Sequence, residues 1–234
     1  MRHTFGPSVP PVRALLDLLV PPRCALCGGG GDPVCPGCLA ALPVLGGPQC
    51  ARCGKPTAEP VADCRECHGR RLGFDTAVAA LAFEGGGRDL VVRFKDAGLR
   101  GLAELAAGVI ATVVHPPECD VVTWVPADRW RTVHRGYHPA QLLAVALARR
   151  WQLPAQALLR AAPIRRPQRG LDHAARRRNV RGAFRPRVML AGQRVVLIDD
   201  VYTTGATLSA CGTALRRGEA GAVAAVSLAR VVRM

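Results

Sequence analysis

Four Cys-x-x-Cys pairs lie between residues 24 and 67, in a segment that is rich in glycine and proline and has few long apolar runs. Two intervening residues let both thiolates of a pair face one point, and two pairs complete the tetrahedral Cys₄ site that Zn²⁺ prefers. Such a segment lacks a hydrophobic core, so bound metal has to supply the folding free energy. The segment is therefore predicted to be a zinc-binding module.

Four pairs make two zinc sites. Sequential pairing is the simplest arrangement, although a crossed pairing fits the same spacing. Both sites are predicted to be structural, because four cysteines fill every coordination position. A redox or disulfide module is the alternative, and the number of pairs disfavours it. In sequential order the ligands are Cys24, Cys27, Cys35 and Cys38 for one ion and Cys50, Cys53, Cys64 and Cys67 for the other.

Composition excludes several classes of protein. Hydrophobic residues make up 49% of the 234 residues, which argues against disorder. No apolar stretch reaches the roughly 18 residues that a membrane span needs, and residues 15–19 are too short and too acidic for a secretory signal. We therefore expect a cytoplasmic protein in a reducing compartment, where structural disulfides are rare. The net charge of +15 fits either a phosphate-bearing partner or the arginine-rich coding bias of a GC-rich genome.

Three regions follow from these patterns. Residues 1–23 form a lead with a short helix over 13–20, residues 24–70 form the cysteine-rich module, and residues 74–234 form an α/β domain in which apolar runs alternate with turn signals. Gly85–Gly87 is interpreted as a turn. Strands are expected at 76–83, 121–126, 157–161, 194–199 and 222–231, and helices at 88–95, 99–114, 139–150 and 206–217.

The most informative segment runs from Val195 to Leu208. It reads as a buried strand, two acids, a turn rich in hydroxyls and the start of a helix. In open parallel sheets, ligands bind beyond the carboxyl ends of the strands, and a helix N-terminus there suits a phosphate. The candidate phosphate cradle is Thr203, Thr204, Gly205, Ala206 and Thr207, and the acids that can accept hydrogen bonds from sugar hydroxyls are Asp199 and Asp200.

This segment resembles the phosphoribosyl pyrophosphate (PRPP) signature of type I phosphoribosyltransferases. The resemblance implies that residues 203–207 hold the 5-phosphate of PRPP and that Asp199 and Asp200 hold its ribose hydroxyls. It also implies Mg²⁺, which would arrive with the pyrophosphate of the ligand. An ordinary strand, turn and capped helix is the alternative interpretation.

Further motifs extend the resemblance over nearly the whole chain. Together with the cysteine-rich front, the runs at 94–98, 135–137 and 176–184 resemble the ComF family of competence-associated, phosphoribosyltransferase-like proteins. The implied fold is a type I phosphoribosyltransferase-like parallel sheet preceded by a zinc ribbon. Lys95 and Arg135 are the implied pyrophosphate contacts. The turn after Arg135 departs from the family pattern, because it reads Tyr-His-Pro, and His134 and His138 there are predicted to be surface residues, with proton transfer as the alternative.

Two functions are expected. The first is PRPP binding by a phosphoribosyltransferase-type (glycosyltransferase) enzyme of unspecified acceptor, linked by family resemblance to DNA uptake, with no general base assigned. The second is a non-catalytic factor that binds single-stranded DNA beside a helicase-like competence protein. Residues 160–187 contain ten arginines and one acid, so this stretch could close over a pyrophosphate or bind a nucleic-acid backbone. A solvated basic helix is the alternative interpretation of that stretch.

Overall fold

The computed structural model describes residues 23–96, 99–127, 136–162 and 182–232. The chain divides into two compact units, Met1–Leu42 and Pro43–Met234. In the first unit, a bridge joins Arg23 to Gly30, and helix α2 (Pro36–Ala40) begins with the proline of the second cysteine pair. The predicted N-terminal lead lies outside the described residues, apart from Arg23.

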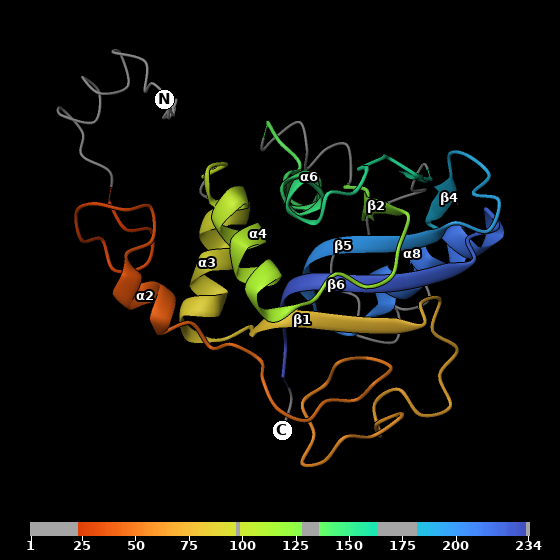
Figure 1. The fold of residues 1–234 in the computed structure, drawn as a ribbon, viewed down its shortest axis with the longest axis horizontal. Coiled ribbons are helices and arrows are strands. Elements are labelled where there is room, and N and C mark those ends of the chain that lie inside the picture. Colours follow the sequence, from red (N-terminus) through yellow and green to blue (C-terminus); the bar gives the residue numbers. More distant parts are fainter. Residues whose placement is uncertain (1–22, 97–98, 128–135, 163–181, 233–234) are drawn as a thin grey trace, which may run out of the picture. The chain divides into compact units, whose positions relative to one another are not determined.

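A four-stranded parallel sheet organises the second unit, with strand order β1-β6-β5-β2 (Figure 1). Its strands are β1 (Thr76–Ala82), β2 (Val121–Trp124), β5 (Arg194–Tyr202) and β6 (Ala222–Arg230). Each neighbouring pair is parallel. All four carboxyl ends therefore meet at one edge of the sheet, where ligands of open α/β folds bind.

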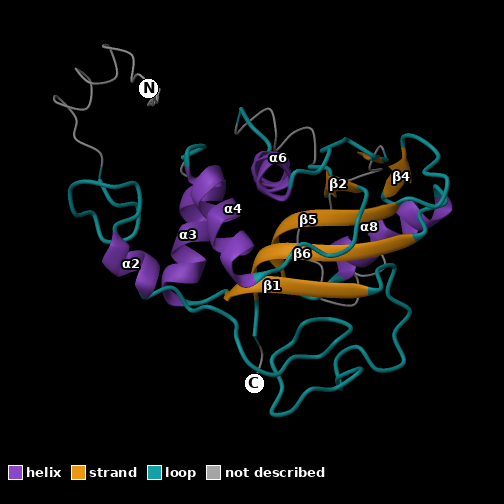
Figure 2. Cartoon of the chain, in the orientation of Figure 1, coloured by secondary structure: helices purple, strands orange, loops and turns teal. Residues whose placement is uncertain are grey.

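Helices cover both faces of this sheet, which explains the unbroken apolar runs in its central strands (Figure 2). Helix α8 (Ala206–Arg217) packs on the face that carries Val195 and Leu197. The opposite face is covered by α3 (Gly85–Asp96), α4 (Leu102–Val113) and α6 (Pro139–Trp151). A small antiparallel pair, β3 (Leu159–Ala161) and β4 (Phe184–Pro186), lies beside α8.

The parallel α/β sheet with a cysteine-rich front confirms the predicted fold class. One local prediction was wrong: residues 85–87 form the first turn of α3 and not a separate turn. The glycines there allow close packing, because a Cβ at Gly87 would overlap the carbonyl oxygen of Ala82 at the end of β1. Within the described parts of the chain, the helices are too short and not apolar enough to cross a membrane.

The second group of four cysteines belongs to the same compact unit as the sheet. Its turn lies directly against β1, since Ala77 donates its N–H to the carbonyl of Arg52 over 3.0 Å. Gly54 has φ +67°, and a Cβ there would overlap the backbone of Ala77. The predicted borders of the cysteine-rich module at 24 and 70 mark a change in sequence character and stay a prediction, whereas the compact units divide between Leu42 and Pro43.

Candidate phosphate-binding site and tetracysteine clusters

The turn that follows β5 leaves a helix N-terminus open at the carboxyl edge of the sheet. Gly205 caps α8 in the left-handed region, with φ +70°, and a Cβ at this position would overlap the Tyr202 hydroxyl. The first recorded bond of the helix runs from the Ser209 N–H to the Gly205 carbonyl, 2.8 Å. The preceding N–H groups of the first turn have no partner within the helix, although that of Ala206 donates to the Thr204 hydroxyl over 3.4 Å. Such groups are suited to a phosphate.

The two acids of β5 point to opposite faces of the sheet, because side chains alternate along a strand. Asp200 is 8% exposed and meets the Lys95 ammonium at the end of α3, with Nζ 2.6 Å from Oδ2. Both residues were predicted to act in the site, and the structure brings them together across 105 residues of sequence. The ion pair lies beside residues 203–207, the candidate phosphate cradle, which we call the phosphate turn. A charged ligand at this turn would meet both groups.

Asp199 differs from Asp200 in its electrostatics. Burial in the protein, and then repulsion from the Asp200 carboxylate, raise the pKa of Asp199 to about 8, while Lys95 acts in the opposite direction. Its Oδ1 accepts the backbone N–H of Asp200 over 2.9 Å. The raised pKa favours the protonated Asp199 carboxyl near neutral pH, which reduces its repulsion with Asp200.

His138 lies inside the site region, so the prediction of a surface residue was wrong. It is half-buried at the N-cap of α6, where Nδ1 faces the N–H of Gln141 at 3.2 Å and Nε2 faces the N–H of Ala127 at 2.7 Å. Only one nitrogen of a neutral ring can accept at a time, and protonation would remove both acceptors. Burial lowers the pKa of His138, which favours the neutral ring that can accept from the N–H of Gln141 or of Ala127. The His-Pro pair was the sequence signal, because proline favours the first helical position.

Tyr137, two residues before α6, ties the start of that helix to the end of α3. Its hydroxyl donates to the carbonyls of Phe94 and Lys95, the latter 3.1 Å away. Arg100 stacks over the tyrosine ring at 5.2 Å and donates to the Gly136 carbonyl over 2.7 Å. The tyrosine that departs from the family pattern thus positions the backbone that carries Lys95. Arg135 and His134 lie outside the described residues.

The structure gathers the cysteines in sequential order, as Cys24/Cys27/Cys35/Cys38 and Cys50/Cys53/Cys64/Cys67, with the sulfurs of each group within 4.8 Å of one another. Recorded Sγ–Sγ distances are 3.8 Å for Cys27–Cys35 and 3.5 Å for Cys53–Cys64, far longer than a disulfide. A tetrahedral Zn²⁺ with Zn–S bonds of about 2.3 Å separates its ligands by about 3.8 Å. Both groups therefore fit a structural zinc ion.

Two arginines join the second group, the Cys50 cluster (Cys50, Cys53, Cys64 and Cys67), to the phosphate turn. Arg230 is 1% exposed, stacks over the Tyr202 ring at 4.6 Å and donates to the Cys53 carbonyl over 2.5 Å. Arg70, three residues after the last cysteine, donates to the Thr204 carbonyl over 3.2 Å. Sequence reasoning missed both, although an arginine that ends an apolar strand was a signal for Arg230.

Comparison with known proteins adds three findings. Residues 15–68 match the family model of a double zinc ribbon domain. The chain is 32% identical over 117 residues to the DNA utilization protein YhgH of Escherichia coli K12, covering 48% of this chain and 50% of that protein. It is 36% identical over 97 residues to competence protein F of Haemophilus influenzae, covering 40% and 42% of the two chains. The chain thus spans about half the length of the curated relatives it matches.

Solved structures matched by this chain include a glutamine PRPP amidotransferase from B. subtilis, with 22% identity, a TM-score of 0.37 and coverage of 61% of this chain and 27% of that one. An adenine phosphoribosyltransferase from Thermoanaerobacter pseudethanolicus has 18% identity, a TM-score of 0.37 and coverage of 61% and 73%. Both TM-scores lie below 0.5, so the fold assignment rests on the sheet and its register. With the zinc ribbon match and the two curated relatives, the resemblance of this chain to the ComF family is confirmed.

Proposed function

We propose that this protein binds PRPP with Mg²⁺ at the carboxyl edge of its sheet and acts as a phosphoribosyltransferase. The observation that carries the proposal is the convergence of the Lys95–Asp200 ion pair with the open N-terminus of α8. A cation, two acids and a free helix N-terminus then lie at one sheet edge, as a phosphorylated sugar carrying a pyrophosphate requires.

Each group would have a separate task. The N–H groups and hydroxyls of residues 203–207 would hold the 5-phosphate, and Asp200 would accept from a ribose hydroxyl. Asp199 would bind the other ribose hydroxyl, and its proton would limit repulsion from the ligand's phosphates. Lys95 would turn from Asp200 to the pyrophosphate, with Arg135 as a second proposed contact. Mg²⁺ would neutralise charge on the pyrophosphate oxygens.

The reaction breaks the bond between C1 of the ribose and the pyrophosphate oxygen, and it forms a bond between C1 and a nucleophilic acceptor. The pyrophosphate leaves with the bonding electrons, and the acceptor loses its proton to solvent. This chain contributes positioning and charge stabilisation of the leaving group, which supply most of the catalysis in such transfers.

The test is a calorimetric titration of zinc-loaded, nucleic-acid-free protein with PRPP in Mg²⁺, beside Asp200→Asn. The native chain should bind saturably, and the variant should bind at least about tenfold more weakly, because a lost hydrogen bond from a charged group is worth about 1.5–3 kcal/mol. Lack of binding at millimolar PRPP, or equal binding by the variant, would refute the proposal.

A second candidate function is the handling of single-stranded DNA. It is supported by the names of the curated relatives, DNA utilization protein and competence protein F, and by the ten arginines of residues 160–187, of which 163–181 lie outside the described residues. A helicase-like competence protein is the proposed partner. Binding of an oligothymidylate that weakens steeply with salt and is unchanged in Asp200→Asn would support this function. A flat salt dependence would contradict it.

A further inference from the structure

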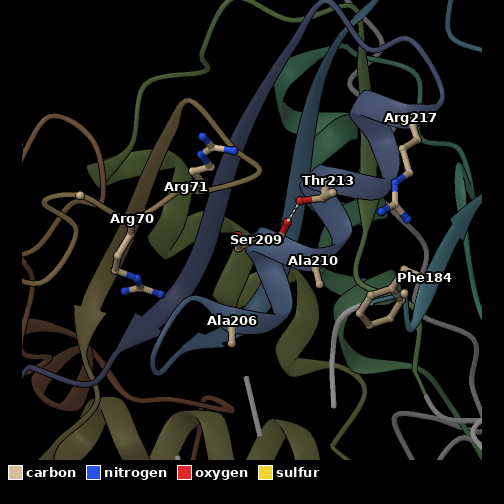
Figure 3. Close-up of a pocket in the computed structure, with 10 residues that line it drawn as sticks. Arg70, Arg71, Phe184, Ala206, Ser209, Ala210, Thr213 and Arg217 are labelled. Atoms are coloured by element: carbon tan, nitrogen blue, oxygen red, sulfur yellow. Dashed lines mark hydrogen bonds between the residues drawn. The ribbon is translucent and has the colours of Figure 1, made fainter. Parts of the chain in front are cut away.

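A cationic groove runs over the outward face of α8, next to the phosphate turn but separate from the Lys95–Asp200 pair (Figure 3). Its floor consists of small residues at helical spacing, Ala206, Ser209, Ala210 and Thr213. The loop at 69–71 forms one wall, and the start of β4 forms the other. The cavity measures about 720 Å³, the size of a small-molecule site. The groups that define this α8 groove are Arg70, Arg71, Phe184, Ser209, Thr213 and Arg217.

The charge of the α8 groove has one sign. Three arginines line it, and its described lining includes no carboxylate. Arg70 is fixed by donating to the carbonyls of Glu66 and Thr204, both over 3.2 Å. Arg71 and Arg217 are exposed, and the described residues provide no acidic partner for either of them. A guanidinium group can donate two parallel hydrogen bonds to the oxygens of one phosphate, so a cluster of arginines is suited to a phosphate ligand.

The hydroxyls on the floor leave a hydrogen-bond donor available. Thr213 donates to the Ser209 carbonyl over 2.8 Å (Figure 3). The Ser209 hydroxyl accepts the Gly73 N–H over 3.0 Å. The proton of the Ser209 hydroxyl therefore remains free for a ligand oxygen. Alanines on either side keep the floor low enough for a ligand to approach the helix. A phosphate lying here would meet arginine and hydroxyl donors together.

One aromatic ring completes the α8 groove. Phe184 starts β4 on the wall opposite Arg70 and Arg71, with Arg217 near it. A planar base can stack on a phenyl ring and on a guanidinium. A bound DNA strand would stack successive bases on several rings, whereas the described lining offers only this one. These features favour a ligand with a single base.

We infer that the α8 groove binds a nucleoside phosphate, with its phosphates between Arg70, Arg71 and Ser209 and its base on Phe184. This site is additional to the proposed PRPP site. Arg70 also donates to the Thr204 carbonyl, so this one side chain would connect a ligand in the groove with the phosphate turn.

The test uses full-length, zinc-loaded protein and ADP as the probe, titrated by calorimetry in the presence of saturating PRPP and Mg²⁺. Arg71→Ala and Arg217→Ala should each weaken ADP binding about tenfold, and the double variant should abolish it. Arg65→Ala is the matched control, because it removes an exposed arginine of the neighbouring turn outside the groove, and it should change the affinity less than twofold. Asp200→Asn should keep ADP binding, so a failed PRPP site does not affect this result.

Four outcomes would overturn the inference. The first two are no binding of ADP at 1 mM, and equal binding of ADP to the native chain and the Arg71→Ala/Arg217→Ala variant. The third is competition of ADP with PRPP together with a loss of affinity in Asp200→Asn, which would assign ADP to the other site. An oligothymidylate of 12 residues that binds far more tightly than ADP, through the same two arginines, would replace the nucleotide by a DNA strand.

Discussion

The two tetracysteine clusters share one spacing but differ in their surroundings. In the Cys24 cluster (Cys24, Cys27, Cys35 and Cys38), only Cys24 is buried, and the cluster belongs to the small N-terminal unit. All four members of the Cys50 cluster are buried, within the same core as Phe74 and Tyr202. The same ligand pattern therefore forms a mostly exposed cluster within the N-terminal unit in the case of Cys24, and a buried part of the sheet unit in the case of Cys50.

This difference has a consequence for function. The Cys50 cluster connects to the phosphate turn through Arg230 and Arg70, which act on Tyr202 and Thr204. Both are positioning residues, since they hold backbone and ring groups next to the proposed ligand. Loss of metal from the Cys50 cluster should thus disturb PRPP binding, whereas loss from the Cys24 cluster should not.

The largest effect is expected from Cys53→Ser compared with Cys27→Ser. Each variant should reduce bound zinc from two ions to one. Cys53→Ser should destabilise the sheet unit by about 4 kcal/mol or more, because it removes a structural metal from the core. Cys27→Ser should leave the main thermal transition within about 0.5 kcal/mol of native. Calorimetric melting with zinc analysis checks this, and equal losses of stability would abolish the distinction between the clusters.

Arg230→Ala tests the contact by which Arg230 joins the Cys50 cluster to Tyr202. The variant loses a charged hydrogen bond to Cys53 and the stacking on Tyr202, so the free energy of unfolding should fall by about 3 kcal/mol. PRPP affinity should fall with it, while both zinc ions remain. Arg88→Ala, an exposed arginine of α3, is the control. If urea titrations of the two variants coincide, Arg230 does not support the turn.

Lys95→Met tests the Lys95–Asp200 ion pair at the proposed ligand site. It leaves the Asp200 carboxylate buried without its cation, so the free energy of unfolding should fall by about 1–3 kcal/mol. Lys95→Met/Asp200→Asn should recover most of this loss. Both of these variants and Asp200→Asn should keep both zinc ions. Chemical denaturation gives the double-mutant cycle. Additive losses would mean that the two side chains do not interact.

The last prediction concerns pH. The raised pKa of Asp199, about 8, means that its stabilising contribution is complete below the unfolded pKa near 4 and is lost as pH rises through 8. The free energy of unfolding of the native chain should therefore fall between pH 6 and pH 8, by at most about 1.4 kcal/mol per pH unit. Asp199→Asn should flatten this slope. An unchanged slope in the variant would assign the pH dependence to another group.

Local sequence predicted much of this molecule. Cysteine spacing predicted both metal clusters, and the run from Val195 to Thr207 predicted strand, turn and helix, because each depends on neighbours within a few residues. Contacts distant in sequence could not be predicted in this way. Arg230 meets the Cys53 carbonyl across 177 residues, and His138 caps a helix whose packing fixes its burial. Residues 85–87 form the first turn of α3, in which Gly87 lies so close to the end of β1 that a Cβ would overlap the Ala82 carbonyl.

The most direct measurement is hydrogen exchange of the zinc-loaded protein, with and without PRPP and Mg²⁺. We predict slower exchange of amides in residues 199–209, together with slower exchange in residues 50–70, which Arg70 and Arg230 connect to the turn. Residues 24–42 should exchange at the same rate in both states. Protection of residues 24–42, or none in residues 199–209, would contradict the assignment of the ligand site and of the Cys50 cluster as its support.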